Sequence, residues 1–185
     1  MDGTVKYIFE AGMLKRVARS GWWAEKIGQP ESVADHSFRT AVIAFILARM
    51  ERLDAERLCT AAAFHDMHEA RLSDLNKITA RYITVSEKLE RRVEADQAQG
   101  LPAELRDSVL GILKLTPRER TILKDADYLE CAFQAKEYYD VGHKGAATWI
   151  GNIAGRLKTK SAKALLARMK RMDSNSWWKG LKKLD

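Results

Sequence analysis

The sequence predicts an all-α protein, a compact single-domain bundle of helices that spans residues 1–185. Three features indicate this fold class. Apolar residues recur every three or four positions through most of the chain, which is the spacing of one helix face. The alternation of apolar and polar residues that is typical of half-buried strands is missing. The chain is also long enough to bury the core of one domain, and no linker rich in Pro, Gly or Ser divides it.

The first helices follow from these apolar faces. One is expected in the first segment, where the face consists of Val5, Ile8, Ala11, Leu14 and Val17. The second covers residues 34–50, and its face consists of Phe38, Ala41, Val42, Phe45 and Ala48. Asp54 is a good N-cap for a third helix that runs to about residue 70, because a short carboxylate accepts hydrogen bonds from first-turn amides.

Two capping signals predict where the next helices begin. Thr84, with Glu87 three residues later, forms a capping box that opens a helix ending near residue 100. Pro102 suits the first turn of the following helix, because an amide proton is not needed there. That helix is expected to end near residue 115.

A stronger signal marks the longest expected helix. Thr116 is placed as an N-cap, Pro117 as the first helical residue and Glu119 as the third. The helix that they open is expected to run to about residue 142. One or two further helices fill residues 146–172 and complete the bundle.

Composition indicates a soluble globular protein. Hydrophobic residues make up 46% of the chain and charged residues 31%, which is ordinary for this class. No apolar run approaches the roughly 20 residues that cross a bilayer, and the N-terminal "MDGTVKYIFEAG" lacks the basic and apolar regions of a signal peptide. Cys59 and Cys131 lie in apolar helical surroundings, where we expect two free thiols rather than a disulfide. A cytoplasmic location is therefore expected.

The net charge of +7 favours anionic partners such as phosphates, nucleotides or nucleic acid. Much of the excess lies between Lys158 and Lys183, where a solvated basic helix face is the simpler interpretation. The same region holds Trp177 and Trp178, and basic residues combined with aromatic ones can bind nucleic acid or a membrane surface. We favour docking of both Trp side chains on the bundle or on a second subunit, because no recognised nucleic-acid motif accompanies them.

Titratable residues gather where the third helix should be buried, in the stretch "AAAFHDMHEARLSD". His65 and Glu69 lie four positions apart and share one helix face, while Asp66 lies about 100° further round. Asp74 follows one turn or a short loop later. Burial of an unpaired carboxylate is costly, so this much acid in a packed segment requires a cation or a set of hydrogen-bond donors.

Two other stretches offer partners for this cluster. His36 lies at the start of the second helix in "ESVADHSFRTA", and Asp127 lies inside an apolar helix in "TILKDADYLECAFQA", on a stripe with Glu130 and Gln134. Two imidazoles and two carboxylates from three helices suit one divalent transition ion, Mn, Co, Fe, Ni or Zn. This predicted set is His36, His65, Asp66 and Asp127. The simpler interpretation of the other two histidines is structural; they are His68 and His143.

These residues resemble the signature of the HD-domain phosphohydrolase superfamily, which is a His, a distant His-Asp doublet and a distant Asp. The longer strings "LKRVARSGWW", "PESVADHS", "HDMHEARLSDL" and "LKDADYLE" are similar to those of its 5′-deoxynucleotidase branch. Together they extend over about two thirds of the chain. The resemblance implies a helical bundle of the HD-domain type, with the core of the metal site at about 30–130 and C-terminal helices at about 146–185.

The resemblance also implies an activity: metal-dependent hydrolysis of nucleoside 5′-monophosphates, preferably deoxy, to nucleoside and phosphate. It implies that the metal ligands are the predicted set of two histidines and two aspartates. Glu69 and Asp74 match the two catalytic carboxylates of the branch, and Arg19 and Trp22 match the strings around its phosphate and sugar contacts. Trp22 would exclude a 2′-hydroxyl by shape; the alternative is a core aromatic. Glu31 and Ser32 more simply cap the second helix than contact substrate.

Other functions remain as alternatives. Guanosine tetraphosphate hydrolases of this superfamily carry an HDxxED motif, but Ala70 follows Glu69 here, and two-metal cyclic-nucleotide enzymes need more histidines than the four in this chain. A basic nucleic-acid-binding module is an alternative of a different class, and its binding would weaken steeply with salt. We expect a small-molecule nucleotide as the partner and a homodimer as the assembly, and neither nucleic acid nor a membrane as a partner.

Overall fold

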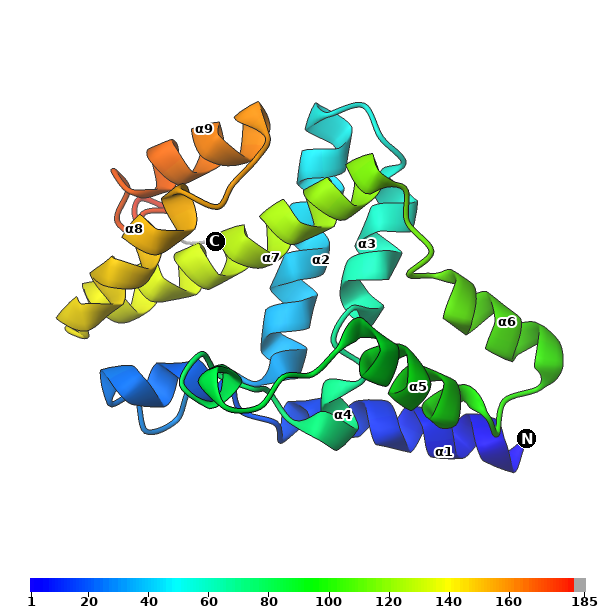
Figure 1. The fold of residues 1–185 in the computed structure, drawn as a ribbon. Helices are drawn as coiled ribbons and strands as arrows, with labels where there is room; N and C mark the ends of the chain where they lie inside the picture. The colour runs from blue at the N-terminus through cyan, green and yellow to red at the C-terminus, as the bar shows by residue number, and fades with distance from the viewer. Residues whose placement is uncertain (182–185) are drawn as a thin grey trace.

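The structure is a computed structural model that describes residues 1–181. Within that range the regular elements are all helices, and the only β-type pairing is one isolated bridge between Ala18 and Ser32. The predicted all-α class is therefore confirmed (Figure 1). The α-helices are α1 (Asp2–Ala11), α2 (Val33–Met50), α3 (Ala55–Phe64), α4 (Glu69–Leu72), α5 (Glu87–Ala98), α6 (Ala103–Gly111), α7 (Pro117–Asp140), α8 (Ala147–Ala154) and α9 (Lys160–Met169). Short 3-10 helices occupy Gly12–Lys15, Ser20–Glu25, Thr79–Arg81 and Lys144–Ala146.

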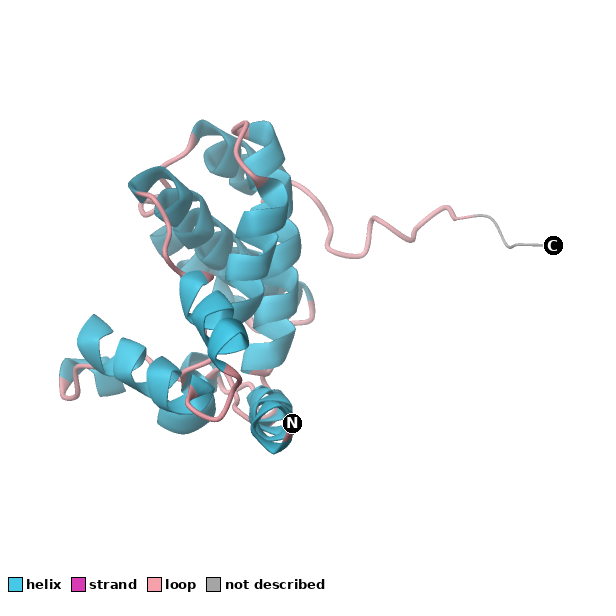
Figure 2. Cartoon of the chain, turned by 90° about the vertical axis from the view of Figure 1, so that its right-hand side faces the viewer, coloured by secondary structure: helices cyan, strands magenta, loops and turns pink. Residues whose placement is uncertain are grey.

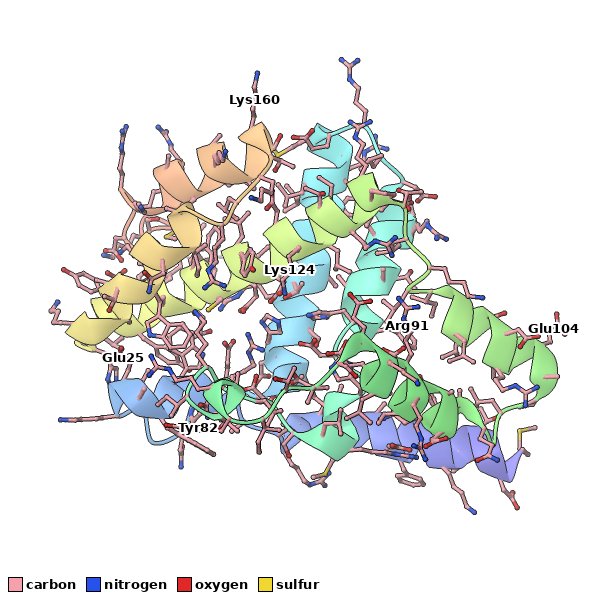
Figure 3. The ribbon with its side chains drawn as sticks, in the orientation of Figure 1. Glu25, Tyr82, Arg91, Glu104, Lys124 and Lys160 are labelled. Carbon is pink, nitrogen blue, oxygen red and sulfur yellow. The ribbon has the colours of Figure 1, made fainter. Side chains whose placement is uncertain are left out.

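The core lies where α2, α3 and α7 pack together, with α7 crossing the other two helices (Figure 1). Leu47, Leu58 and Leu129, one from each helix, are fully buried. Each such side chain stabilises the fold by about 1.5–3 kcal/mol relative to an exposed one. Side chains fill the space between these helices, whereas Glu104 and Lys160 point outward at the rim (Figure 3). This packing fixes the relative positions of the start of α2, the end of α3 and the middle of α7.

Capping decides where the two long helices begin. Ser32 caps α2 through a capping box: its Oγ accepts from the amide of Asp35, and the Asp35 carboxylate accepts from the Ser32 amide. The predicted capping box of α7 is confirmed, because Thr116 Oγ1 accepts from the amide of Glu119 and the Glu119 carboxylate accepts from the Thr116 amide. Both caps set the register of the polar side chains on the helices that follow them.

Several predicted boundaries are wrong. The third helix ends at Phe64 rather than near residue 70, because the backbone tightens into turns in which Met67 donates to Phe64 and Glu69 to Asp66. The first helix ends at Ala11 and gives way to a 3-10 helix.

Two later boundaries also differ from the prediction. The N-cap of α5 is Ser86, whose Oγ accepts from the amide of Leu89, so Glu87 is the first helical residue and Thr84 lies outside the helix. Pro102 is the N-cap of α6, which ends at Gly111. The local sequence pattern did not show which of the neighbouring residues is the N-cap of each helix.

The one or two helices predicted over residues 146–172 are two, α8 and α9, which pack on α7. After α9 the chain runs away from the helical body (Figure 2), and Trp177 is 76% exposed. The expected docking of this Trp on the bundle is therefore wrong, and docking on a second subunit stays a prediction. The last four residues of the predicted C-terminal region, 182–185, lie outside the described residues. Among residues 1–181 no helix has the length and apolar character that crossing a membrane requires.

Candidate metal centre and active site

The four side chains predicted as metal ligands come together from three parts of the chain. His36 Nε2, from the first turn of α2, lies 3.4 Å from Asp127 Oδ1 on α7 and 3.6 Å from Asp66 Oδ2. His65 Nε2, in the turn after α3, lies 3.1 Å from the same Asp66 oxygen. One ligand atom from each of His36, His65 and Asp127 lies within 4.8 Å of the others. The packing of α2, α3 and α7 thus gathers residues that are far apart in the sequence.

The protonation of both imidazoles fits a cation at this point. His65 Nδ1 lies 2.7 Å from the carbonyl oxygen of Ala62, which fixes the proton on Nδ1. His65 Nε2 is buried, has no hydrogen-bond partner among the described residues, and lies 3.1 Å from Asp66 Oδ2. A divalent ion at this point would give both the nitrogen and the carboxylate oxygen a partner. The donor set therefore fits a divalent ion that takes nitrogen and oxygen ligands.

His36 is prepared in the same way by Glu130. His36 Nδ1 lies 2.5 Å from Glu130 Oε2, so Nδ1 carries the proton and Nε2 points toward Asp66 and Asp127. Burial and the nearby Arg19 guanidinium would lower the pKa of His36, but the carboxylates of Asp127 and Glu130 raise it to about 10. At neutral pH this pKa places a proton on Nε2 as well, and a divalent ion would take the place of that proton in a carboxylate–histidine–metal arrangement.

Both aspartates of the cluster are ionised. Burial alone would raise the pKa of Asp66, but His65, His36 and Arg19 hold it well below its usual range. The pKa of Asp127 is likewise held low, against the effect of burial, by His36, Lys124 and His65. Lys124 Nζ lies 2.6 Å from Asp127 Oδ2 and supplies a positive charge at the edge of the cluster.

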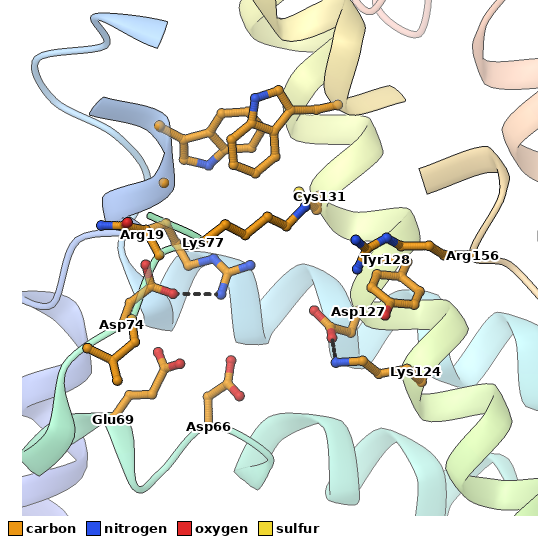
Figure 4. Close-up of a pocket in the computed structure, with 15 residues that line it drawn as sticks. Arg19, Asp66, Glu69, Asp74, Lys77, Lys124, Asp127, Tyr128, Cys131 and Arg156 are labelled. Carbon is orange, nitrogen blue, oxygen red and sulfur yellow. Dashed lines mark hydrogen bonds and ion pairs between the residues drawn. The ribbon is translucent and has the colours of Figure 1, made fainter. Parts of the chain in front are cut away.

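Asp74 binds both Arg19 and the start of the 3-10 helix η2 (Ser20–Glu25). Its Oδ2 accepts from the Ser20 amide at 2.7 Å and from Ser20 Oγ at 3.0 Å, and its Oδ1 accepts from Arg19 Nη1 at 3.2 Å (Figure 4). Asn76 in turn donates to Ser20 Oγ. The guanidinium of Arg19 is thus anchored beside the ionised aspartates, and neighbouring carboxylates raise its pKa despite its burial.

Glu69 differs from Asp74 in its contacts. Its Oε2 is buried and has no hydrogen-bond partner within residues 1–181. Burial, followed by the charges of Asp66 and Asp74, raises the pKa of Glu69 to about 8. The structure therefore pairs Asp74, whose carboxylate accepts three hydrogen bonds, with a carboxyl group at Glu69 whose raised pKa favours the protonated form at neutral pH.

Trp22 lies in the core beside the cavity. It is only 2% exposed, and its Nε1 donates to Glu31 Oε1 at 3.0 Å. The ring of Tyr138 meets it edge-on at 5.1 Å between centroids, and the ring of Trp149 lies tilted against it at 4.4 Å. The expectation that Glu31 caps α2 is wrong, because its carboxylate accepts from Trp22 while Ser32 and Asp35 form the capping box. Little of the Trp22 ring is left to contact a ligand.

The aspartates, Glu69, Arg19 and Trp22 line one cavity of about 320 Å³, a volume that suits a nucleotide-sized ligand (Figure 4). Its acidic end holds Asp66, Glu69, Asp74 and Asp127, next to Arg19. Side chains that the sequence did not single out as site residues also line it: Tyr128, Cys131, Trp149 and Arg156. No local signal marks them, since they lie on ordinary amphipathic helices or in the loop after α8.

The fold and the site place this protein in the class of helical bundles whose interior side chains can bind a metal ion. Two histidines and two aspartates meet there from separate parts of the chain. The family model of the HD domain matches residues 11–169, so the chain belongs to the HD domain family. Over 148 residues the chain is 34% identical to 5′-deoxynucleotidase HDDC2 of Mus musculus. The aligned residues cover 77% of this chain and 73% of that relative. The resemblance seen in the sequence motifs is thereby confirmed.

Further relatives agree with this. The chain is 34% identical over 146 residues to 5′-deoxynucleotidase HDDC2 of Homo sapiens, covering 76% of this chain and 70% of the human protein. The solved structure of predicted coding region AF1432 from Archaeoglobus fulgidus matches with a TM-score of 0.67 and 34% identity, covering 96% of this chain and all (100%) of that chain. The similarity thus extends through nearly the whole fold.

Proposed function

We propose that this protein hydrolyses nucleoside 5′-monophosphates, preferably deoxy, to nucleoside and phosphate. The single observation that carries the proposal is the convergence of His36, His65, Asp66 and Asp127 beside a nucleotide-sized cavity that also holds Arg19, Glu69 and Asp74. The names of the mammalian relatives, 5′-deoxynucleotidases, support the same substrate class. We also propose that residues 1–185 form a single HD domain.

The predicted set of two histidines and two aspartates would hold one divalent transition ion, whose identity among Mn, Co, Fe, Ni and Zn is left to experiment. Such an ion supplies Lewis-acid polarisation of the phosphoryl group and a more acidic water. Glu130 binds Nδ1 of His36, so Nε2 is the nitrogen that would bind the ion. The carbonyl of Ala62 does the same for His65.

Arg19 would bind the phosphate. A guanidinium offers two parallel N–H donors to phosphoryl oxygens and offsets their charge. Asp74 fixes its direction through Nη1, and Ser20 fixes Asp74 in turn. The phosphate dianion would then lie between this guanidinium and the aspartates at the acidic end of the cavity.

The two catalytic carboxylates would have different tasks. As the water oxygen forms its bond to phosphorus, a proton passes from the water to the carboxylate of Asp74. As the bond from phosphorus to the 5′-oxygen breaks, the protonated Glu69 gives its proton to that oxygen, so the nucleoside leaves as an alcohol. Proton exchange with solvent then restores both groups. The assignment rests on the buried Glu69 Oε2, which has no partner among the described residues, and on Asp74, whose Oδ1 accepts a single hydrogen bond and keeps a lone pair for the proton.

The test is release of phosphate from a panel of deoxy- and ribonucleoside 5′-monophosphates, with guanosine tetraphosphate and cyclic nucleotides in the same panel. Activity should vanish with a chelator and return with Mn²⁺ or Co²⁺. Asp66→Ala should abolish it while leaving the helical circular dichroism spectrum. Full turnover by Asp66→Ala, or turnover of other panel members alone, would refute the proposal.

We further propose a homodimer in the cytoplasm. On α2 the apolar residues Phe38, Val42, Phe45 and Ile46 are 40–74% exposed at helical spacing, which forms an apolar face of the kind found in subunit interfaces. Both cysteines in the described part of the chain are free thiols, as a reducing compartment allows. Light scattering on the wild type and on Phe38→Glu tests the dimer: the variant should be monomeric.

A further inference from the structure

The end of the cavity opposite the acidic cluster is aromatic. Two indole rings lie together there, away from Asp66 and Glu69 (Figure 4), and the cavity-lining tryptophans are Trp22 and Trp149. A nucleotide whose phosphate lies at Arg19 and the aspartates would direct its sugar and base toward these rings. The exposure of each indole decides which of the two the base would contact.

Trp22 cannot offer a broad surface, because it is only 2% exposed and the ring of Trp149 lies against it at 4.4 Å. Trp149, on α8, is half-buried and therefore keeps part of its ring open to the cavity. Trp149 is thus the indole that a ligand in this cavity meets.

The Trp149 ring is held in place from three sides. Its Nε1 donates to Glu25 Oε1 at 3.2 Å, and Trp22 supports its inner side. Gly21 allows the close approach, since a β-carbon there would lie 2.8 Å from Cη2 of Trp149. A fixed aromatic surface binds a planar ligand without losing side-chain freedom on binding.

A positive group already uses the π-surface of this ring. Lys77 Nζ lies 5.2 Å from the ring centroid of Trp149, and Lys77 lines the same cavity (Figure 4). A cation at that distance is attracted by the electron-rich face of an indole. The contact shows that this face can be reached by groups inside the cavity.

We propose that Trp149 is a specificity-determining residue on which the nucleobase stacks, so that the site selects nucleotides over phosphate esters without a base. Every base has a π-face, so stacking accepts all of them, and the larger purine rings gain more contact than pyrimidines. The inference rests on the proposed nucleotidase function and extends it to the nucleoside half of the substrate.

The experiment compares 2′-deoxyadenosine 5′-monophosphate with 2-deoxyribose 5-phosphate, which carries the same phosphate and sugar carbons but no base. For Trp149→Leu we expect the ratio of the two kcat/KM values to fall about tenfold or more, mainly through KM of the nucleotide. Trp149→Phe keeps an aromatic face and should retain most of the ratio. Trp23→Leu is the matched control, because Trp23 is 57% exposed and is not among the cavity-lining residues.

Two results would overturn the proposal. One is an equal loss for both substrates in Trp149→Leu, which indicates a structural role only; the other is an unchanged ratio. Calorimetric titration with the nucleotide, which needs no turnover, separates this inference from the proposed function. If the wild type hydrolyses neither compound, tighter nucleotide binding by wild type than by Trp149→Leu still supports the stacking surface, and equal binding refutes it.

Discussion

His36 Nδ1 lies 2.5 Å from Glu130 Oε2, and both side chains are completely buried between α2 and α7. Arg39 donates from Nε to the other oxygen of the same carboxylate at 2.9 Å. The carboxylate is therefore held from one side and directs the imidazole from the other. This contact turns Nε2 of His36 toward Asp66 and Asp127, so it couples the packing of two helices to the metal centre.

Glu130→Gln should weaken binding of a divalent ion by about 10–100-fold, which is typical when the group that orients a ligating histidine is changed. An amide of the same shape cannot accept the Nδ1 proton as strongly. Competition with a chromophoric chelator measures the affinity. The control is Glu137→Gln, since Glu137 also contacts Arg39, at 2.7 Å, but is 44% exposed and does not touch His36. Equal affinities for the wild type and Glu130→Gln would contradict the account.

Glu69→Gln should lower kcat for nucleotides by roughly 10²–10⁴-fold, because an amide has no proton to give to the 5′-oxygen. Burial and the charges of Asp66 and Asp74 raise the pKa of Glu69 to about 8, so the wild type has this proton at neutral pH. An ester with a good leaving group, p-nitrophenyl phosphate, needs no proton donor and should lose much less. An equal loss for both esters would refute the role of Glu69 as general acid.

Arg19→Lys should raise KM for nucleotides by about tenfold or more, since a lysine ammonium cannot make two parallel hydrogen bonds to phosphate and keep the contact with Asp74. Steady-state kinetics on the wild type, on Arg19→Lys and on Arg16→Lys tests this. Arg16 is exposed, and within the described residues its side chain bonds only to the carbonyl of Gly12, so it serves as the control. If Arg19→Lys and Arg16→Lys behave alike, Arg19 does not bind the phosphate.

The ion pair between Glu10 and Arg71 joins α1 to α4 and should make stability depend on pH. The hydrogen bond from Arg71 Nε, at 2.5 Å, lowers the pKa of Glu10, and Gln97 adds a second donor. Because the folded-state pKa is below the unfolded value of about 4.3, the contribution is complete above that pH and is lost as pH falls through the folded-state value.

Glu10→Gln should therefore lower the free energy of unfolding at pH 7 by about 0.5–1 kcal/mol, as for other partly exposed pairs. At pH 3 the difference from the wild type should be much smaller. Urea denaturation at both pH values measures it. A difference that stays constant, or grows toward low pH, would show that the charge of Glu10 is not what stabilises this contact.

Sequence patterns predicted the helices best where a cap and an apolar face agree. Thr116 and Glu119 marked the start of α7 correctly because their side chains bond to the backbone beside them. The predicted end of α3 was wrong because the chain turns after Phe64 and brings His65 and Asp66 toward α2 and α7. No local sequence pattern encodes that turn. Local chemistry thus fixes helix starts, while tertiary packing decides where this helix stops.

The site shows the same division. His36, His65, Asp66 and Asp127 were found because polar groups on apolar helix faces are unusual, and the motifs they form are specific. Glu130 lay on the same stripe as Asp127, but its bond to a histidine on another helix depends on how α2 and α7 cross. Trp149 had no signal at all, since an aromatic on an amphipathic helix is most often a core residue. Its place in the cavity follows only from the packing of α8 on α7.

Anomalous diffraction from crystals of the protein grown with Mn²⁺ tests the central claim most directly. We expect one strong peak between His36 Nε2, His65 Nε2 and the carboxylates of Asp66 and Asp127. Crystals that bind Mn²⁺ elsewhere, with no density between these four side chains, would contradict it.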